Sequence, residues 1–318
     1  MLRNRATVLG LAVSLVFLTG VVWWATQQEP PSLPQTPGQL LALAGAVALY
    51  GLNTAVRAER WHALLRQAGA TPRRADTYAL TVIGYTGNNV LPARAGDAVR
   101  VVLAAPRAAT TMRTVVGTLL AERLLDVAVV VTLFVLVGYA ALGAVSRGDL
   151  EIIGLATAAA IVAVIVAVVV FRRSERALRF VKPMLASMLD LRRGRHGGRM
   201  LAVTALIWWI ESLVWMATGA AVGLEMNPLE ALYVVGLASV FALVPSGPAY
   251  VGTQDAAVVI AVKALGGSNS LAVSYILMLR FVIVVPITVV GFVLLAARYG
   301  GISQLRAARA QARTVEPR

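Results

Sequence analysis

The sequence predicts an all-α polytopic membrane protein with six full transmembrane helices and two re-entrant helical hairpins that are related as an inverted repeat. Hydrophobic residues make up 58% of the 318 residues and charged residues only 14%, and the mean hydropathy is +0.76, as expected for an integral membrane protein. Two pairs of apolar runs, each too short to cross a bilayer, flank turns rich in proline and glycine. The positive residues gather in alternate segments between the apolar runs.

The chain has no cysteine and only two histidines, His62 and His196, both in basic segments. This composition excludes disulfides and thiolate metal sites and argues against histidine-based catalysis. We therefore expect a protein that is not an enzyme, with no catalytic residue, metal or cofactor. The net charge of +14 could indicate a nucleic-acid partner. Its distribution beside apolar segments instead predicts contact with an anionic membrane surface, and no nucleic acid.

The elements follow as a single transmembrane domain over residues 1–318. The first apolar run exceeds the apolar part of an ordinary signal peptide, and no small-residue cleavage site follows it, so it is predicted as a transmembrane helix. The six full spans are predicted over residues 6–26, 40–56, 114–142, 151–171, 200–224 and 271–297. The basic segments are predicted as an in-plane amphipathic stretch, a surface loop and a tail, over residues 57–75, 172–199 and 298–318.

The topology follows from the positive residues. With the N-terminus inside, all but four of the 29 Lys and Arg residues fall in segments that face the cytoplasm. This asymmetry agrees with the positive-inside rule. We therefore expect a plasma-membrane protein with both termini in the cytoplasm.

The first predicted hairpin turns between the apolar runs 77–90 and 99–105. Its turn contains Asn89, Pro92 and Gly96. Proline lacks a backbone N–H and disfavours helix at the preceding residue, and glycine allows conformations that other residues resist. The two runs are therefore expected to enter the membrane and leave it on the same side.

The second predicted hairpin has the same design, between the runs 229–243 and 256–265. Its turn residues are Pro245, Gly247, Pro248 and Gly252. Each hairpin precedes a span with a buried arginine, so that two units, about 76–143 and 229–297, run in opposite directions. Such an inverted repeat is used for alternating access. The alternative is that two kinks coincide by chance.

Ionisable residues within the predicted membrane region are candidate binding groups, because a charge there is costly and usually functional. They are Arg94, Asp97, Arg100, Glu122, Arg123, Asp126, Glu211, Asp255 and Arg280. Arginine suits phosphate because its planar fork donates two hydrogen bonds, and half-helix N-termini near Gly96 and Gly252 would add oriented N–H groups. The carboxylates suit sugar hydroxyls, an ammonium group or a coupling proton.

The alternative is that these charges pair with one another and hold the helices together. Arg123 and Asp126 are three residues apart and can pair on one helix. Arg280 has no acidic neighbour in its own span, so its partner is expected to be Asp255, Glu211 or a bound anion.

Two motifs resemble those of a transmembrane family named for the lysylphosphatidylglycerol synthase flippase domain. The first is Asn-Val-Leu-Pro-Ala-Arg-Ala-Gly-Asp-Ala-Val-Arg at 89–100, followed by Ala-Glu-Arg-Leu-Leu-Asp at 121–126. The second is Pro-Ser-Gly-Pro at 245–248 with Gly252, Gln254 and Asp255, where family members usually have Pro-Gly-Gly and a Glu. The resemblance covers residues 5–300.

The resemblance implies a lipid flippase fold. The longest polar segment, 172–199, is far too short for the aminoacyl-transfer domain of bifunctional relatives, so we expect a stand-alone member without that domain. Relatives are linked to aminoacylated phosphatidylglycerol or to lipid-linked glycans. We expect a flippase for a phosphate-bearing lipid, preferably a polyprenyl-phosphate-linked sugar, with a membrane glycosyltransferase or other lipid-modifying enzyme as a partner. The alternatives are an aminoacyl-phosphatidylglycerol flippase, a non-transporting scaffold subunit, and an enzyme acting on lipid phosphates.

Overall fold

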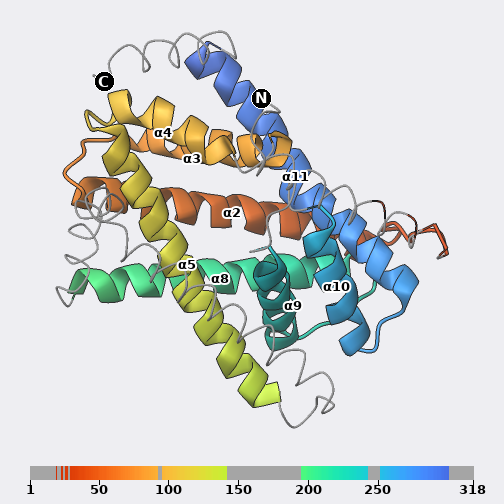
Figure 1. Ribbon diagram of the computed structural model, residues 1–318. Helices are drawn as coiled ribbons and strands as arrows, with labels where there is room; N and C mark the ends of the chain where they lie inside the picture. Colours follow the sequence, from red (N-terminus) through yellow and green to blue (C-terminus); the bar gives the residue numbers. More distant parts are fainter. Residues whose placement is uncertain are drawn as a thin grey trace.

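The computed structural model describes residues 29–91, 95–141, 195–242 and 251–300, with the isolated positions 19, 23, 26 and 27. Its regular structure in these residues consists of eight helices and no strand, which confirms the all-α prediction (Figure 1). The helices are α2 Pro37–Gln67, α3 Arg74–Val90, α4 Ala95–Arg107, α5 Met112–Ala141, α8 Arg195–Ala220, α9 Pro228–Phe241, α10 Thr253–Ala264 and α11 Asn269–Tyr299.

Three of these helices, α2, α8 and α11, are long and apolar enough to cross a membrane. A helix rises 1.5 Å per residue, so about 20 residues cover the hydrocarbon core. The chain is therefore a membrane protein with several apolar helices. That it has six full spans stays a prediction, because the predicted spans 6–26 and 151–171 lie outside the described residues, apart from isolated positions.

Helices α2 and α9 begin with the same local signal. Thr36 precedes Pro37, and its side chain accepts a hydrogen bond from the Gln39 backbone N–H, while the Gln39 side chain accepts one from the Thr36 N–H. Asn227 and Glu230 form the same reciprocal pair around Pro228. These capping boxes satisfy backbone donors that a helix leaves unpaired at its start.

Helices α3 and α4 pack side by side as a hairpin (Figure 1). The Thr71 N–H donates to the Ala108 carbonyl over 2.9 Å and joins the two open ends. Near the turn the backbones touch, since a Cβ on Gly96 would lie 1.9 Å from the Gly84 carbonyl oxygen. The break that the sequence predicts is confirmed, with α3 ending at Val90 and α4 beginning at Ala95. The turn residues Pro92 and Arg94 lie outside the described residues.

Helices α9 and α10 form the second pair of short helices and also lie side by side (Figure 1). Helix α10 begins directly after Gly252, whose φ of 91° is a conformation that glycine adopts readily. Pro245, Gly247 and Pro248 fall outside the described residues. The structure therefore has interrupted helices at both predicted places, and their entry into the membrane from opposite faces stays a prediction.

Helix α2 continues beyond the boundary that the sequence suggests. In place of an in-plane amphipathic stretch from residue 57, α2 runs unbroken to Gln67 and packs along α8. Arg60 and Trp61 are buried, with exposed fractions of 2% and 0%. The physical reason is that Arg60 and Arg57 in this turn have acidic partners on α5 and α8, which hold the turn inside the helical bundle.

Helix α11 fixes the tip of the first hairpin. The Thr86 hydroxyl on α3 donates to the Ile287 carbonyl over 3.0 Å, and the Asn89 amide donates to the Thr288 hydroxyl over 3.1 Å. Gly291 leaves the space for this approach, because a Cβ there would lie 1.9 Å from the Thr86 hydroxyl oxygen. The end of α3 is thereby held against α11, beside the cavity described next.

Candidate functional site

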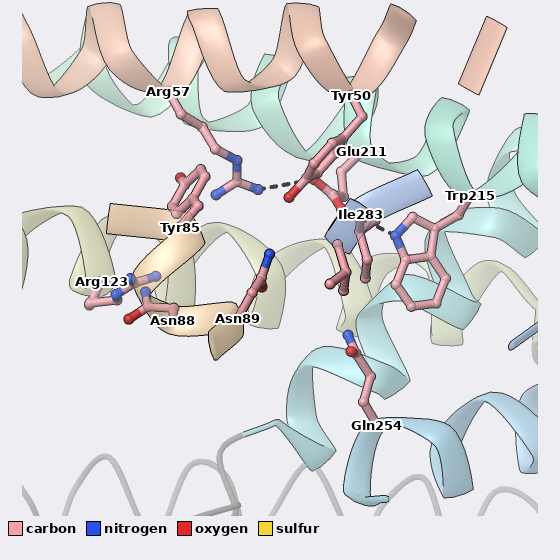
Figure 2. A pocket seen from close by; sticks show the side chains of 11 residues that line it. Tyr50, Arg57, Tyr85, Asn88, Asn89, Arg123, Glu211, Trp215, Gln254 and Ile283 are labelled. Atoms are coloured by element: carbon pink, nitrogen blue, oxygen red, sulfur yellow. Dashed lines mark hydrogen bonds and ion pairs between the residues drawn. The ribbon is translucent and has the colours of Figure 1, made fainter. Parts of the chain in front are cut away.

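A cavity of about 170 Å³ lies where both interrupted helix pairs approach the long helices (Figure 2). Six helices contribute to its walls, which carry charged, amide and aromatic side chains. The lining residues are Tyr50, Arg57, Tyr85, Asn88, Asn89, Arg123, Glu211, Trp215, Gln254, Ile283 and Val284.

Glu211 on α8 is the acidic group of this cavity. Its carboxylate accepts hydrogen bonds from the Asn53 amide at 2.5 Å, from Arg57 Nη2 at 3.2 Å and from the Trp215 indole at 3.2 Å. Figure 2 shows Arg57 reaching from α2 toward Glu211 across the cavity wall. Three donors therefore hold the carboxylate in place, and Arg57 balances its charge.

Arg60, one turn along α2, forms a deeply buried ion pair with Asp126. Its Nη1 and Nη2 donate to the two oxygens of Asp126 at 2.7 and 3.1 Å, and Nη1 also donates to the Thr204 hydroxyl at 3.0 Å. Glu122 lies 3.6 Å from the same guanidinium. Such a two-pronged contact satisfies both oxygens of a carboxylate and fixes α2, α5 and α8 together.

Arg100 on α4 provides the second cation beside Glu122. Its Nη2 donates to the Glu122 carboxylate over 3.1 Å, and its guanidinium lies 3.9 Å from the centroid of the Trp61 ring. The Arg100 side chain is 1% exposed. A cation over an aromatic face is attracted by the ring electrons, so Arg100 links the first hairpin to both α2 and α5.

Each hairpin also places a carboxylate against an arginine of the following long helix. Asp97, the third residue of α4, pairs with Arg123 on α5 over 3.2 Å, 26 residues further on. Asp255, the third residue of α10, accepts a 3.0 Å hydrogen bond from Arg280 Nε on α11, 25 residues further on, and a second one from Nη2. In both pairs, the third residue of the helix that follows the predicted turn contacts an arginine 25 or 26 residues further along the chain.

These carboxylates also stand at the N-terminal turns where the sequence predicts an anion. Asp255 accepts a hydrogen bond from the Gly252 N–H over 2.8 Å, and Asp97 accepts one from the Asn88 amide over 3.3 Å. A negative group is favoured at a helix N-terminus by the helix dipole. In the structure the chain itself supplies that negative group at both hairpins.

The structure thus brings most of the predicted site residues together, with different partners from those expected. Asp126 pairs with Arg60, Arg123 pairs with Asp97, and Arg280 pairs with Asp255, one of its expected partners. Ion pairs connect Asp97, Arg100, Glu122 and Arg123. Arg60 joins Glu122 to Asp126, and Arg57 joins Asp126 to Glu211. Of the eight predicted ionisable residues that the structure describes, Arg123 and Glu211 line the cavity.

Sequence reasoning missed the polar face of α2. Asn53, Arg57 and Arg60 follow a spacing of four and three residues, which places them on one side of a helix. This stripe was the available signal. It was hidden because the arginines adjoin a run of basic residues that resembles a cytoplasmic segment. The hairpin amides Asn88 and Gln254 are further cavity residues without a charge to single them out.

The arrangement suits the binding of a small polar group. Arginine donors, amides and one carboxylate meet in a cavity whose volume corresponds to about six water molecules. In the described part of the chain, no three His, Asp or Glu side chains are grouped as metal ligands.

These features define an all-helical membrane protein with a polar cavity at the ends of interrupted helices. Comparison with known protein families identifies the family more specifically. The family model described as the lysylphosphatidylglycerol synthase TM region matches residues 7–291, so the chain belongs to this family, as its motifs predict.

A curated relative is similar over most of the chain. It is named glycosyltransferase AglD, from Haloferax volcanii, and it is 24% identical over 335 aligned positions. The match covers 91% of this chain and 54% of the relative, so the chain spans about half the length of that protein. No solved structure matches the chain. Together the comparisons indicate a membrane protein with a lipid-related function.

Proposed function

We propose that this protein is a lipid flippase that moves the headgroup of a phosphate-bearing lipid between leaflets through the central cavity. The observation that carries this proposal is the meeting of both hairpin tips at one polar cavity. Asn88 and Asn89 lie at the end of α3, and Gln254 lies at the start of α10. Interrupted helices near the bilayer midplane form the substrate sites of many transporters, and broken backbone at that depth survives beside a wet cavity.

The size of the cavity limits what it binds. Its volume of about 170 Å³ is below the roughly 300–1,000 Å³ of pockets that enclose a whole small ligand. A compact headgroup enters such a space, and a long hydrocarbon chain does not. The tail of the lipid therefore stays in the bilayer while the headgroup crosses.

The lining favours a polyprenyl-phosphate-linked sugar among phosphate-bearing lipids. Arg57 and Arg123 supply guanidinium groups that match phosphate oxygens. Asn88, Gln254 and Glu211 supply the amide and carboxylate groups that hydrogen-bond sugar hydroxyls. The similarity to a protein named as a glycosyltransferase supports the sugar class.

Aminoacyl-phosphatidylglycerol is the second candidate substrate. It is favoured by Glu211, because a carboxylate at the cavity wall attracts an ammonium group, and by the family to which the chain belongs. A non-transporting scaffold subunit is the remaining alternative. The mutual pairing of the buried charges favours it, since those pairs also serve stability alone.

The proposal includes a topology and a partner. We assign six full spans, two re-entrant hairpins from opposite faces, and both termini to the cytoplasmic side of the plasma membrane. The equivalent pairs Asp97–Arg123 and Asp255–Arg280 support the inverted repeat. The chain would act without chemical conversion of the lipid, beside a membrane glycosyltransferase or another lipid-modifying enzyme.

The deciding experiment reconstitutes purified protein in liposomes with a fluorescent polyprenyl-phosphate-hexose and follows its exposure to an impermeant quencher. Wild-type protein should move the lipid faster than protein-free liposomes. Gln254→Leu and Glu211→Gln should each lower the rate at least about tenfold, the effect of losing one hydrogen bond to a charged or buried group. Glu59→Gln, at an exposed carboxylate that does not line the cavity, is the matched control and should retain the rate.

The same preparation separates the alternatives. Faster movement of lysyl-phosphatidylglycerol than of the sugar lipid would transfer the assignment to the second substrate. If neither lipid moves faster than in empty liposomes, the scaffold subunit is the alternative that remains. A change in the mass of the lipid after incubation would indicate an enzyme.

A further inference from the structure

A second hollow lies between α3 and the C-terminal part of α11. It is an open groove of about 440 Å³ and shares no lining residue with the central cavity. Its walls are mainly apolar, and its polar groups stand at one end. The lining residues are Arg74, Ala75, Tyr78, Ala79, Val82, Leu294 and Arg298.

The two arginines stand together because of where their helices begin and end. Arg74 is the first residue of α3, and Arg298 lies in the last turn of α11. Arg298 Nη1 donates to the Ala75 carbonyl over 3.0 Å, which ties the end of α11 to the first turn of α3. The helix packing therefore holds Arg74 and Arg298 together at one end of the groove, which we call its mouth.

The mouth carries an excess of positive charge. Two of the lining residues are cationic and none is acidic. Glu59 on α2 accepts hydrogen bonds from Arg74 at 2.9 Å and from the Tyr78 hydroxyl at 3.1 Å, and so balances one of the two cations. A guanidinium has five N–H donors. Arg74 and Arg298 each make a single hydrogen bond within the described residues, so donors remain for an anionic ligand.

The apolar part of the groove extends inward from this mouth. Val82 lies eight residues beyond Arg74, which is about 12 Å along a helix. Ala79 lies between them on the same side, and Leu294 lies one turn inside Arg298. A groove with cations at one end and small apolar side chains below them matches a lipid, whose phosphate lies at the interface and whose chain points into the bilayer.

We propose that this groove binds an anionic, phosphate-bearing lipid of the adjacent leaflet. Its phosphate contacts Arg74 and Arg298, and one acyl chain lies against Ala79, Val82 and Leu294. This inference concerns binding alone and does not depend on transport through the central cavity. Charge complementarity selects the lipid, because a zwitterionic headgroup brings its own cation toward the two arginines.

The test uses the absence of cysteine from the natural chain. A single cysteine at Val82 carries a bimane label in the groove. A single cysteine at Val290, eight residues before Arg298 and 49% exposed on α11, carries the same label at a matched depth. Both variants are placed in vesicles of phosphatidylglycerol and phosphatidylcholine, with brominated chains on one lipid at a time, so that quenching reports the lipid beside the label.

We expect brominated phosphatidylglycerol to be preferred at Val82 by about fivefold over phosphatidylcholine, the effect of one net cationic side chain near the surface. At Val290 the two lipids should quench equally. Arg74→Gln combined with Arg298→Gln changes exposed side chains and should abolish the preference at Val82. Equal quenching at Val82, or a preference that survives the double substitution, would overturn the proposal.

Discussion

Replacing Arg60 by methionine should lower the free energy of unfolding by about 3–5 kcal/mol. The Arg60 side chain is 1% exposed and donates to both oxygens of Asp126, at 2.7 and 3.1 Å. Methionine retains much of the apolar volume and removes only the charge and its donors. The substitution therefore tests the ion pair and not the packing.

The magnitude follows from what remains after the change. Asp126 keeps a 10% exposed side chain without its main partner, and Glu122 loses a cation at 3.6 Å. Removing one partner of a buried pair costs about 3–5 kcal/mol because the other charge stays desolvated. Arg57, which lies 3.9 Å from Asp126, offsets part of that cost and places the expectation toward the lower end.

The assay is the unfolding free energy in lipid bicelles, with Arg74→Met as the control. Arg74 also forms a 2.9 Å pair, with Glu59, but these side chains are 70% and 41% exposed. Breaking an exposed pair should cost no more than about 1 kcal/mol. Adding Asp126→Leu to Arg60→Met should recover most of the loss, because no unpaired anion then remains at that position. Equal costs for Arg60→Met and Arg74→Met would refute the reasoning.

Two further predictions concern the helix packing and the topology. Gly291→Ala should cost about 1–3 kcal/mol of unfolding free energy, because its Cβ would lie 1.9 Å from the Thr86 hydroxyl oxygen. The control is Gly45→Ala, whose new Cβ has no atom within 4 Å; it should be neutral or stabilise α2 by up to about 1 kcal/mol. A neutral Gly291→Ala would contradict the close approach of α3 and α11. Cysteines at Ala95 and Ser246 should react with an impermeant thiol reagent from opposite sides of the membrane, and labelling from one side would exclude the inverted repeat.

The interruptions of the helices could be predicted from the sequence because proline and glycine act locally. The turn that contains Pro92 separates α3, which ends at Val90, from α4, which begins at Ala95. Gly252, predicted as a turn residue, directly precedes α10 and has a positive φ. These signals need no knowledge of the rest of the fold, since they depend on the backbone of one or two residues.

The partners of the charges could not be predicted in the same way. Helical spacing shows which side chains share a face, and so it paired Arg123 with Asp126. In the structure, Asp126 pairs with Arg60, which lies 66 residues earlier in the chain. That pairing depends on how α2 and α5 pack together, which no local pattern contains. The polar stripe of Asn53, Arg57 and Arg60 shows the face of α2 that is buried, but not the helices that cover it.

The ion pairs of the two hairpins change how substitutions at the site must be interpreted. Asp97 and Asp255 stand at the N-terminal turns of α4 and α10, where an anionic headgroup would be favoured, and each is bound by an arginine. Replacing Arg123 or Arg280 alone therefore removes a possible phosphate ligand and also leaves a carboxylate without that cation. A loss of transport in such a variant has two physical causes. Neutralising Asp97 together with Arg123 removes both charges, so only the comparison of single and paired changes separates headgroup binding from the cost of a released carboxylate.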